Sequence, residues 1–107
     1  MSLDFMLKDA DGNTLFDANI THNLNKMASE AGVYKVLWRP EEIEVEFAAQ
    51  VVQILQEGLC RLVSNPAYFK QFNAANGWGL YEHFVPFCIE VLEACQVNPD
   101  AIVEVSR

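Results

Sequence analysis

The chain has 107 residues, of which 51% are hydrophobic, and its 15 acidic residues outnumber seven basic ones to give a net charge of −8. A chain of this length and apolar content can form one core, so we expect a single domain over residues 1–107 and exclude a disordered tail or linker. An acidic surface repels phosphate backbones and the seven cations are scattered along the chain, so nonspecific nucleic-acid binding is excluded as well.

The N-terminal residues predict a β-hairpin. Leu3, Phe5 and Leu7 share one face of an alternating pattern, and the polar stretch after them contains an Asp-Gly pair at residues 11–12, which favours a tight turn. The second strand of the hairpin is expected over the short apolar run at residues 14–16.

A change to helical spacing after Thr21 predicts the first helix. We expect it over residues 22–31, with Thr21 as its N-cap and Gly32 as its stop or interruption. Residues 33–38 either continue this helix or form a separate apolar turn. The Arg-Pro pair at residues 39–40 then forces a break, because a residue before proline avoids the helical region.

The second and longest predicted helix begins at Pro40 and ends near residue 64. Proline suits a first helical turn, and the four glutamates between Glu41 and Glu46 would lie where the helix dipole favours negative charge. A continuous apolar stripe follows as far as the Ser-Asn-Pro sequence at residues 64–66.

Further helices are expected towards the C-terminus. Residues 66–72 predict a short helix with its aromatic residues, Tyr68 among them, turned inward, and residues 73–79 predict a loop because glycine and asparagine supply turn chemistry. A third main helix should span residues 80–97, with either a kink or a restart at Pro86.

A β-branched run at residues 101–105 predicts a final strand that joins the N-terminal hairpin. The expected fold is therefore α+β. A three-stranded antiparallel sheet, built from the hairpin and the C-terminal strand, should carry three main helices on one face.

The cysteines indicate the cellular compartment in which the protein works. Cys60, Cys88 and Cys95 all fall in apolar helical stretches, where thiols usually act as small buried hydrophobes, so we expect reduced thiols and a cytoplasmic protein. No apolar run approaches the ~20 residues that span a bilayer, and Asp4 stands where a signal peptide would carry positive charge. Neither secretion nor membrane insertion is expected.

Polar side chains gather at the entry of the first predicted helix. Thr21, His22 and Asn23 place a hydroxyl, an imidazole and an amide where free backbone N–H groups favour anions. The alternative is structural, with Thr21 or Asn19 capping the helix and Asn23 bonding to backbone in the preceding turn.

Trp38 and Arg39 form a second candidate group, because they put an indole beside a guanidinium. Arginine recognises phosphate with two parallel hydrogen bonds, so Arg39 could meet an anionic ligand. Equally, Arg39 could pair with Glu42 or lie across an aromatic ring as a structural clamp.

Asn76, Trp78 and Tyr81 form a third candidate group in a glycine-containing loop. A tryptophan between glycines, three residues before a tyrosine, can stack on a ring-shaped ligand or anchor a protein partner. The structural alternative is that Trp78 covers the small core from a tight turn.

Catalytic and metal-binding patterns are sparse. The chain has only two histidines, His22 and His83, as candidate general acids or bases, and no nucleophile elbow or phosphate-binding loop is present. Residues 9–14 imitate the start of a calcium loop, but Thr14 replaces the required glycine and Ile20 the closing glutamate. No Cys-x-x-Cys pair serves zinc. We predict no metal, no cofactor and no catalytic residue.

Four segments resemble, in order and spacing, a group of small hypothetical proteins encoded by bacteria and their phages. They are residues 19–24 (NITHNL), 37–42 (LWRPEE), 76–81 (NGWGLY) and 105–107 (VSR). The resemblance covers nearly the full length and carries no activity to transfer. It implies a free-standing cytoplasmic domain of the phage or prophage accessory kind, and it raises the standing of the residues in these segments as a site.

The leading hypothesis is a non-enzymatic binding module for a small anionic or nucleotide-like ligand, with its pocket between the entry of the first helix, Arg39 and the Trp78 loop. The alternative is a protein-interaction module, either an inhibitor of a host factor or a subunit of a homo-oligomer, whose negative charge suits a basic partner. An enzyme that uses His22 is the third and least favoured reading.

Overall fold

The computed structural model describes all residues from Met1 to Arg107, and the predicted α+β class is confirmed. The strands are β1 (Ser2–Lys8), β2 (Thr14–Thr21) and β3 (Ile102–Ser106). The helices are α1 (Asn25–Glu30), α2 (Tyr34–Trp38), α3 (Ala48–Ser64), α4 (Pro66–Lys70) and α5 (Tyr81–Val97), and short 3-10 turns occupy His22–Leu24 and Pro40–Ile43.

The sheet is antiparallel with β1 in the centre, in the order β2-β1-β3. Leu3, Phe5 and Leu7 are fully buried, and Phe5 lies opposite Ala18 on one side and Val105 on the other. The alternating pattern thus places one face of β1 in the core, as expected for a sheet with one buried face. The hairpin and the C-terminal strand form the sheet as predicted.

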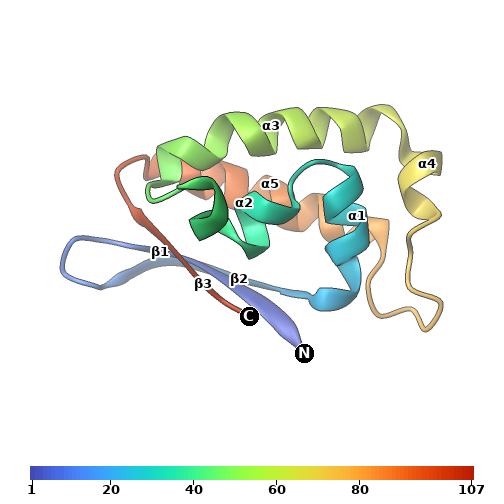
Figure 1. Ribbon diagram of the computed structural model, residues 1–107, viewed down its shortest axis with the longest axis horizontal. Coiled ribbons are helices and arrows are strands. Elements are labelled where there is room, and N and C mark those ends of the chain that lie inside the picture. Colours follow the sequence, from blue (N-terminus) through green and yellow to red (C-terminus); the bar gives the residue numbers. More distant parts are fainter.

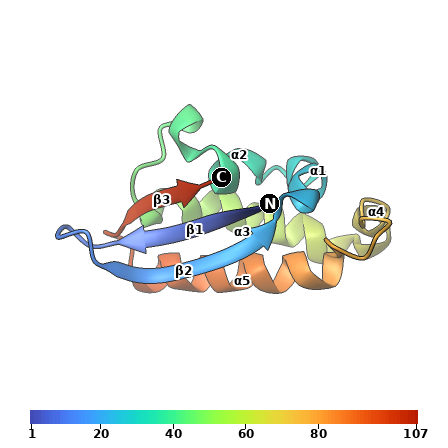
Figure 2. The same ribbon diagram turned by 90° about the horizontal axis from the view of Figure 1, so that it is seen from below.

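The helices lie on one side of the sheet, and α3 and α5 run roughly along the direction of β1 and β2 (Figures 1 and 2). These two long helices pack against each other, and α5 also contacts β2. Twenty-five buried hydrophobic residues form one continuous cluster, and no polar side chain is buried. None of the helices has the length and apolar content needed to cross a membrane.

The hairpin turn forms where the Asp-Gly pair predicted it. One carboxylate oxygen of Asp9 accepts hydrogen bonds from the backbone N–H groups of Asp11 and Asn13, at 3.0 and 2.8 Å, and Gly12 has a φ of 86°. The hydrogen bonds from Asn13 lower the pKa of Asp9.

The second strand is much longer than the predicted run at residues 14–16, because β2 continues to Thr21. Its later residues pair with the start of β1, with Ile20 opposite Leu3 and Thr21 opposite Ser2. The predicted helix over residues 22–31 is therefore a 3-10 turn followed by the short helix α1. Gly32, at a φ of 80°, separates α1 from α2, so residues 33–38 do not continue the first helix. They form a separate element, as one alternative had it, but this element is the short helix α2 and not a turn.

The predicted start of the longest helix is wrong. Pro40 opens only a 3-10 turn, which Glu44 ends in the left-handed conformation with a φ of 58°. The chain then extends so that Phe47 pairs with Ile102, and α3 begins at Ala48. Glutamates after a proline are a local signal for the start of a helix. The backbone before α3 is instead determined by the pairing of Phe47 with the distant strand β3.

Three smaller expectations change towards the C-terminus. Tyr68 is exposed rather than turned inward, although its neighbour Phe69 is buried. Helix α5 runs uninterrupted through Pro86, so no restart occurs. Cys60 is exposed on α3, whereas Cys88 and Cys95 are buried as expected, and all three thiols are free.

Candidate ligand-binding site

The predicted site residues fall into two separate groups in the structure. His22, Trp38 and Arg39 line one hollow. Asn76 and Trp78 belong to the loop before α5, to which Asn23 of the turn after β2 is hydrogen-bonded, and none of the three lines that hollow. The single pocket expected between the helix entry, Arg39 and the Trp78 loop therefore does not form.

Trp38 is the structural centre of the first group. Its side chain is only 2% exposed, so its ring belongs to the core and is not free to stack on a ligand. Tyr34 stacks on it with ring centroids 5.6 Å apart and planes tilted by 16°, and the indole Nε1–H donates a hydrogen bond to Nδ1 of His22 at 2.9 Å. Trp38 thus fixes the positions of two side chains at the hollow.

The bond from Trp38 determines how His22 can act. Because Nδ1 accepts a hydrogen bond, the proton of the neutral imidazole sits on Nε2. His22 is half-buried and lines the hollow. The ring can therefore offer a ligand one N–H donor.

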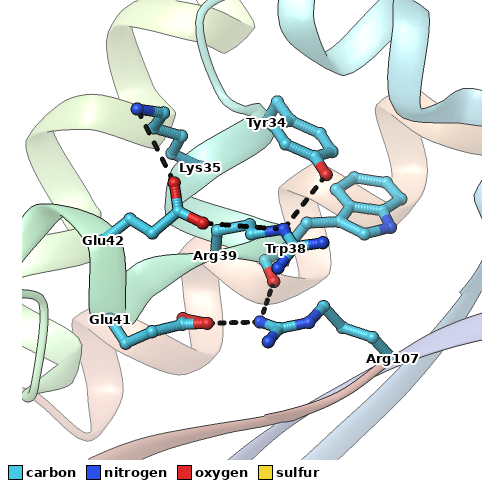
Figure 3. Close-up of polar contacts among 7 residues, drawn as sticks. All are labelled: Tyr34, Lys35, Trp38, Arg39, Glu41, Glu42 and Arg107. Carbon is cyan, nitrogen blue, oxygen red and sulfur yellow. Dashed lines mark hydrogen bonds and ion pairs between the residues drawn. The ribbon is translucent and has the colours of Figure 1, made fainter.

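Arg39 follows α2 directly and lies beside Tyr34 and Glu42 (Figure 3). Its Nε donates a long hydrogen bond to the Tyr34 hydroxyl at 3.4 Å and lies 3.8 Å from a carboxylate oxygen of Glu42. The contact with Tyr34 raises the pKa of Arg39, which is charged at all physiological pH values. The expected partner Glu42 is present, whereas in place of an aromatic ring beneath the guanidinium there is a hydrogen bond to the Tyr34 hydroxyl. Both contacts use only Nε.

Arg107 is a site residue that sequence reasoning left out of the candidate set. Its Nη1 donates to the backbone carbonyl of Trp38 at 2.7 Å and to a carboxylate oxygen of Glu41 (Figure 3). That hydrogen bond lowers the pKa of Glu41. The one signal that pointed to Arg107 was its place in the last segment of the family resemblance, because a partner 69 positions away leaves no local pattern.

The hollow that joins these groups has a volume of about 430 Å³. Its lining residues come from the two chain ends next to β1 and β3, from the turn after β2, from the start of α1 and from both ends of α2: Met1, His22, Asn25, Tyr34, Trp38, Arg39 and Arg107. Two of the seven cations of this acidic chain thus meet at one opening. Two guanidinium groups at one opening suit an anion with several oxygens.

Thr21 has a structural role. Its hydroxyl oxygen accepts the backbone N–H of Asn23 at 3.2 Å, which caps the 3-10 turn. This N–H is therefore satisfied within the chain. The prediction that free backbone N–H groups at the helix entry attract an anion therefore does not hold for this N–H, because the entry is a three-residue turn capped by Thr21.

The loop before α5 is held by a set of hydrogen bonds. Asn23 donates from Nδ2 to the backbone carbonyl of Trp78 at 2.7 Å, and Asn76 accepts the backbone N–H of Trp78 at 2.9 Å. Gly79 has a φ of 126° and lies against the side chains of Thr21 and Asn23. The indole of Trp78 itself is 74% exposed, so the alternative in which it covers the core is wrong.

Tyr81 has a packing role at the start of α5. Its hydroxyl donates to the carbonyl of Leu62 on α3 at 2.8 Å, and its backbone N–H donates to Asn73 at 2.7 Å. Lys70 lies 5.5 Å from the centre of its ring. Tyr81 thus links α5 to α3 and does not face the hollow.

The chain matches no family model, no curated protein and no solved structure. The resemblance to small bacterial and phage proteins remains an expectation, and function has to be argued from the chemistry of the hollow.

Proposed function

We propose that this protein is a non-enzymatic binding module for a small anion of the phosphate type, held between Arg39 and Arg107. The observation that carries the proposal is that two arginines from distant parts of the chain line one hollow, and each has guanidinium N–H groups that bond to nothing in the protein. Arg39 uses only Nε and Arg107 only Nη1 within the protein. The remaining guanidinium nitrogens can form parallel hydrogen bonds to phosphate oxygens.

Glu41 and Glu42 limit the affinity but favour a defined geometry. Each carboxylate contacts one arginine, so the two positive charges are offset, and each guanidinium is restrained before a ligand arrives. Two to four charge-assisted hydrogen bonds, less the cost of association, correspond to a Kd on the order of 0.1 mM. We therefore expect a moderate affinity that falls as salt rises.

Calorimetric titration of the protein with inorganic pyrophosphate at low ionic strength tests this proposal. Arg39→Gln and Arg107→Gln should each weaken binding about tenfold, since each removes charge-assisted hydrogen bonds. Lys70→Gln is the matched control, because it also removes one positive charge but lies on α4, outside the hollow. No binding by the unaltered protein, or equal losses in all three variants, would contradict the proposal.

A second candidate function is contact with a protein partner through the Trp78 loop. The indole is 74% exposed, and its loop is fixed by hydrogen bonds from Asn23 and to Asn76. It can therefore insert into a pocket of a partner protein with little loss of conformational entropy. The net charge of −8 favours a basic partner, and a second copy of the chain is the other option. Sedimentation of the unaltered protein and of Trp78→Ala, alone and with a basic test protein, checks both. Identical behaviour of the two proteins would exclude this role.

The biological setting is part of the proposal. The three free thiols suit a reducing compartment, which supports a cytoplasmic protein. The resemblance of residues 19–24, 37–42, 76–81 and 105–107 to small proteins of bacteria and phages supports a phage or prophage accessory role.

A further inference from the structure

A second hollow adjoins the arginine site. It has a volume of about 240 Å³ and is lined by Asn25, Lys26, Ser29 and Tyr34, so that it shares Asn25 and Tyr34 with the first. The two hollows therefore meet at Asn25 and Tyr34. The larger hollow, at about 430 Å³, lies by itself in the range of small-molecule sites, ~300–1,000 Å³, whereas the smaller one reaches this range only together with the larger. Inorganic phosphate would leave the smaller hollow empty.

Tyr34 is built as a platform between the two hollows. One face of its ring stacks on the buried indole of Trp38, and its hydroxyl meets Nε of Arg39 at 3.4 Å. The ring is half-buried, borders both openings, and is thus held in place with part of its surface open. A fixed aromatic ring with an open surface suits the stacking of a flat ligand group.

The smaller hollow also offers polar groups. Asn25 and Ser29 are both exposed, and they place a side-chain amide and a hydroxyl at its edge. An amide can donate and accept at once, which matches the polar edge of a nucleobase. Lys26 adds a cation near Phe72, with its Nζ 6.0 Å from the ring centre.

We infer that the ligand is a nucleoside monophosphate or a close analogue, with its phosphate at Arg39 and Arg107 and its base against Tyr34 and Asn25. This inference rests on the proposed anion site and adds the ring that accompanies the anion. The buried Trp38 supports the platform, while the exposed Trp78 lies outside both hollows.

The experiment compares three probes by calorimetry: ribose 5-phosphate, adenosine 5′-monophosphate and guanosine 5′-monophosphate. At least one nucleotide should bind about tenfold more tightly than ribose 5-phosphate, because base stacking on an aromatic ring adds to the phosphate contacts. Tyr34→Leu should abolish that preference, whereas Tyr34→Phe, which keeps the ring, should retain it. Asn25→Ala should weaken nucleotide binding a few-fold and leave ribose 5-phosphate unchanged.

Nuclear magnetic resonance of the unaltered protein gives a readout that does not depend on whether a variant folds. The nucleotide should shift the backbone amide resonances of Lys26 and Ser29, which line the smaller hollow and not the larger one, and ribose 5-phosphate should not. Equal affinities for all three probes would overturn the inference and leave the anion site standing. Failure of every probe to bind would overturn both. Tight nucleotide binding that is insensitive to Arg39→Gln would place the ligand elsewhere and also overturn the inference.

Discussion

Replacing Gly58 with alanine should destabilise the protein, although Gly58 lies inside helix α3, where alanine is the better helix former. A Cβ atom at this position would lie 2.1 Å from Cγ1 of Val33, whereas ordinary van der Waals contact is 3.4–4 Å. Val33 is fully buried and immediately precedes α2, which carries Tyr34 and Trp38 to the hollow. The close approach of α3 to Val33 thus helps to position the site.

The expected magnitude follows from two opposing terms. Overpacking a well-filled core costs about 1–3 kcal/mol, and a contact as short as that with Val33 belongs at the upper end. Alanine in place of glycine inside a helix stabilises the folded state by about 1 kcal/mol. Gly58→Ala should therefore lower the free energy of unfolding by about 2 kcal/mol.

Urea unfolding followed by circular dichroism measures this change, and a double-mutant cycle with Val33→Ala isolates its cause. Val33→Ala removes the clashing methyl group, so Gly58→Ala made in that background should be neutral or stabilising by up to ~1 kcal/mol. A stabilising effect of Gly58→Ala in the unaltered protein would refute the reasoning. An equal loss in both backgrounds would show that Val33 is not the cause.

Two further predictions concern titratable groups. At pH 8 a thiol reagent should modify only Cys60 in the folded protein, because burial raises the pKa of Cys95 to about 12 and that of Cys88 further still. Mass spectrometry would count one modification before unfolding and three after it, and rapid labelling of a second thiol would contradict the burial. For Glu41, carbon-detected titration should find a pKa below the ordinary 4.5, and this pKa should rise in Arg107→Gln because the hydrogen bond from Arg107 is the largest cause of the lowering. The contact stabilises the fold above pH 4.5 and is lost as the pH falls through the lowered pKa, so an unchanged pKa in the variant would refute the pairing.

Much of the fold could be predicted because its signals are local. The alternation of Leu3, Phe5 and Leu7 and the Asp-Gly turn determine the hairpin, and the apolar stripe of α3 determines a long helix. The start of α3 could not be predicted in this way. It depends on the pairing of Phe47 with Ile102, a contact between positions far apart in the chain, while the glutamates after Pro40 give a locally valid helix signal.

In the site too, features with local sequence signals could be predicted and long-range contacts could not. Trp38 and Arg39 stood out as neighbours in the sequence, and His22 as a polar group at a helix entry. Their contacts, Trp38 to His22 and Arg107 to the Trp38 carbonyl, depend on how α2 lies against the sheet. The Trp78 ring is exposed, but it does not line the hollow that holds the arginines, and its backbone is bonded to Asn23 instead.

The central claim is that Arg39 and Arg107 hold one anion together. Its most direct test is to follow the side-chain Nε–H resonances of the three arginines while inorganic pyrophosphate is added at low salt. We expect the Arg39 and Arg107 signals to shift and to saturate with the same Kd. The signal of Arg61, a residue of α3 that does not line the hollow, should stay in place. Shifts in all three signals, or in none, would contradict this claim.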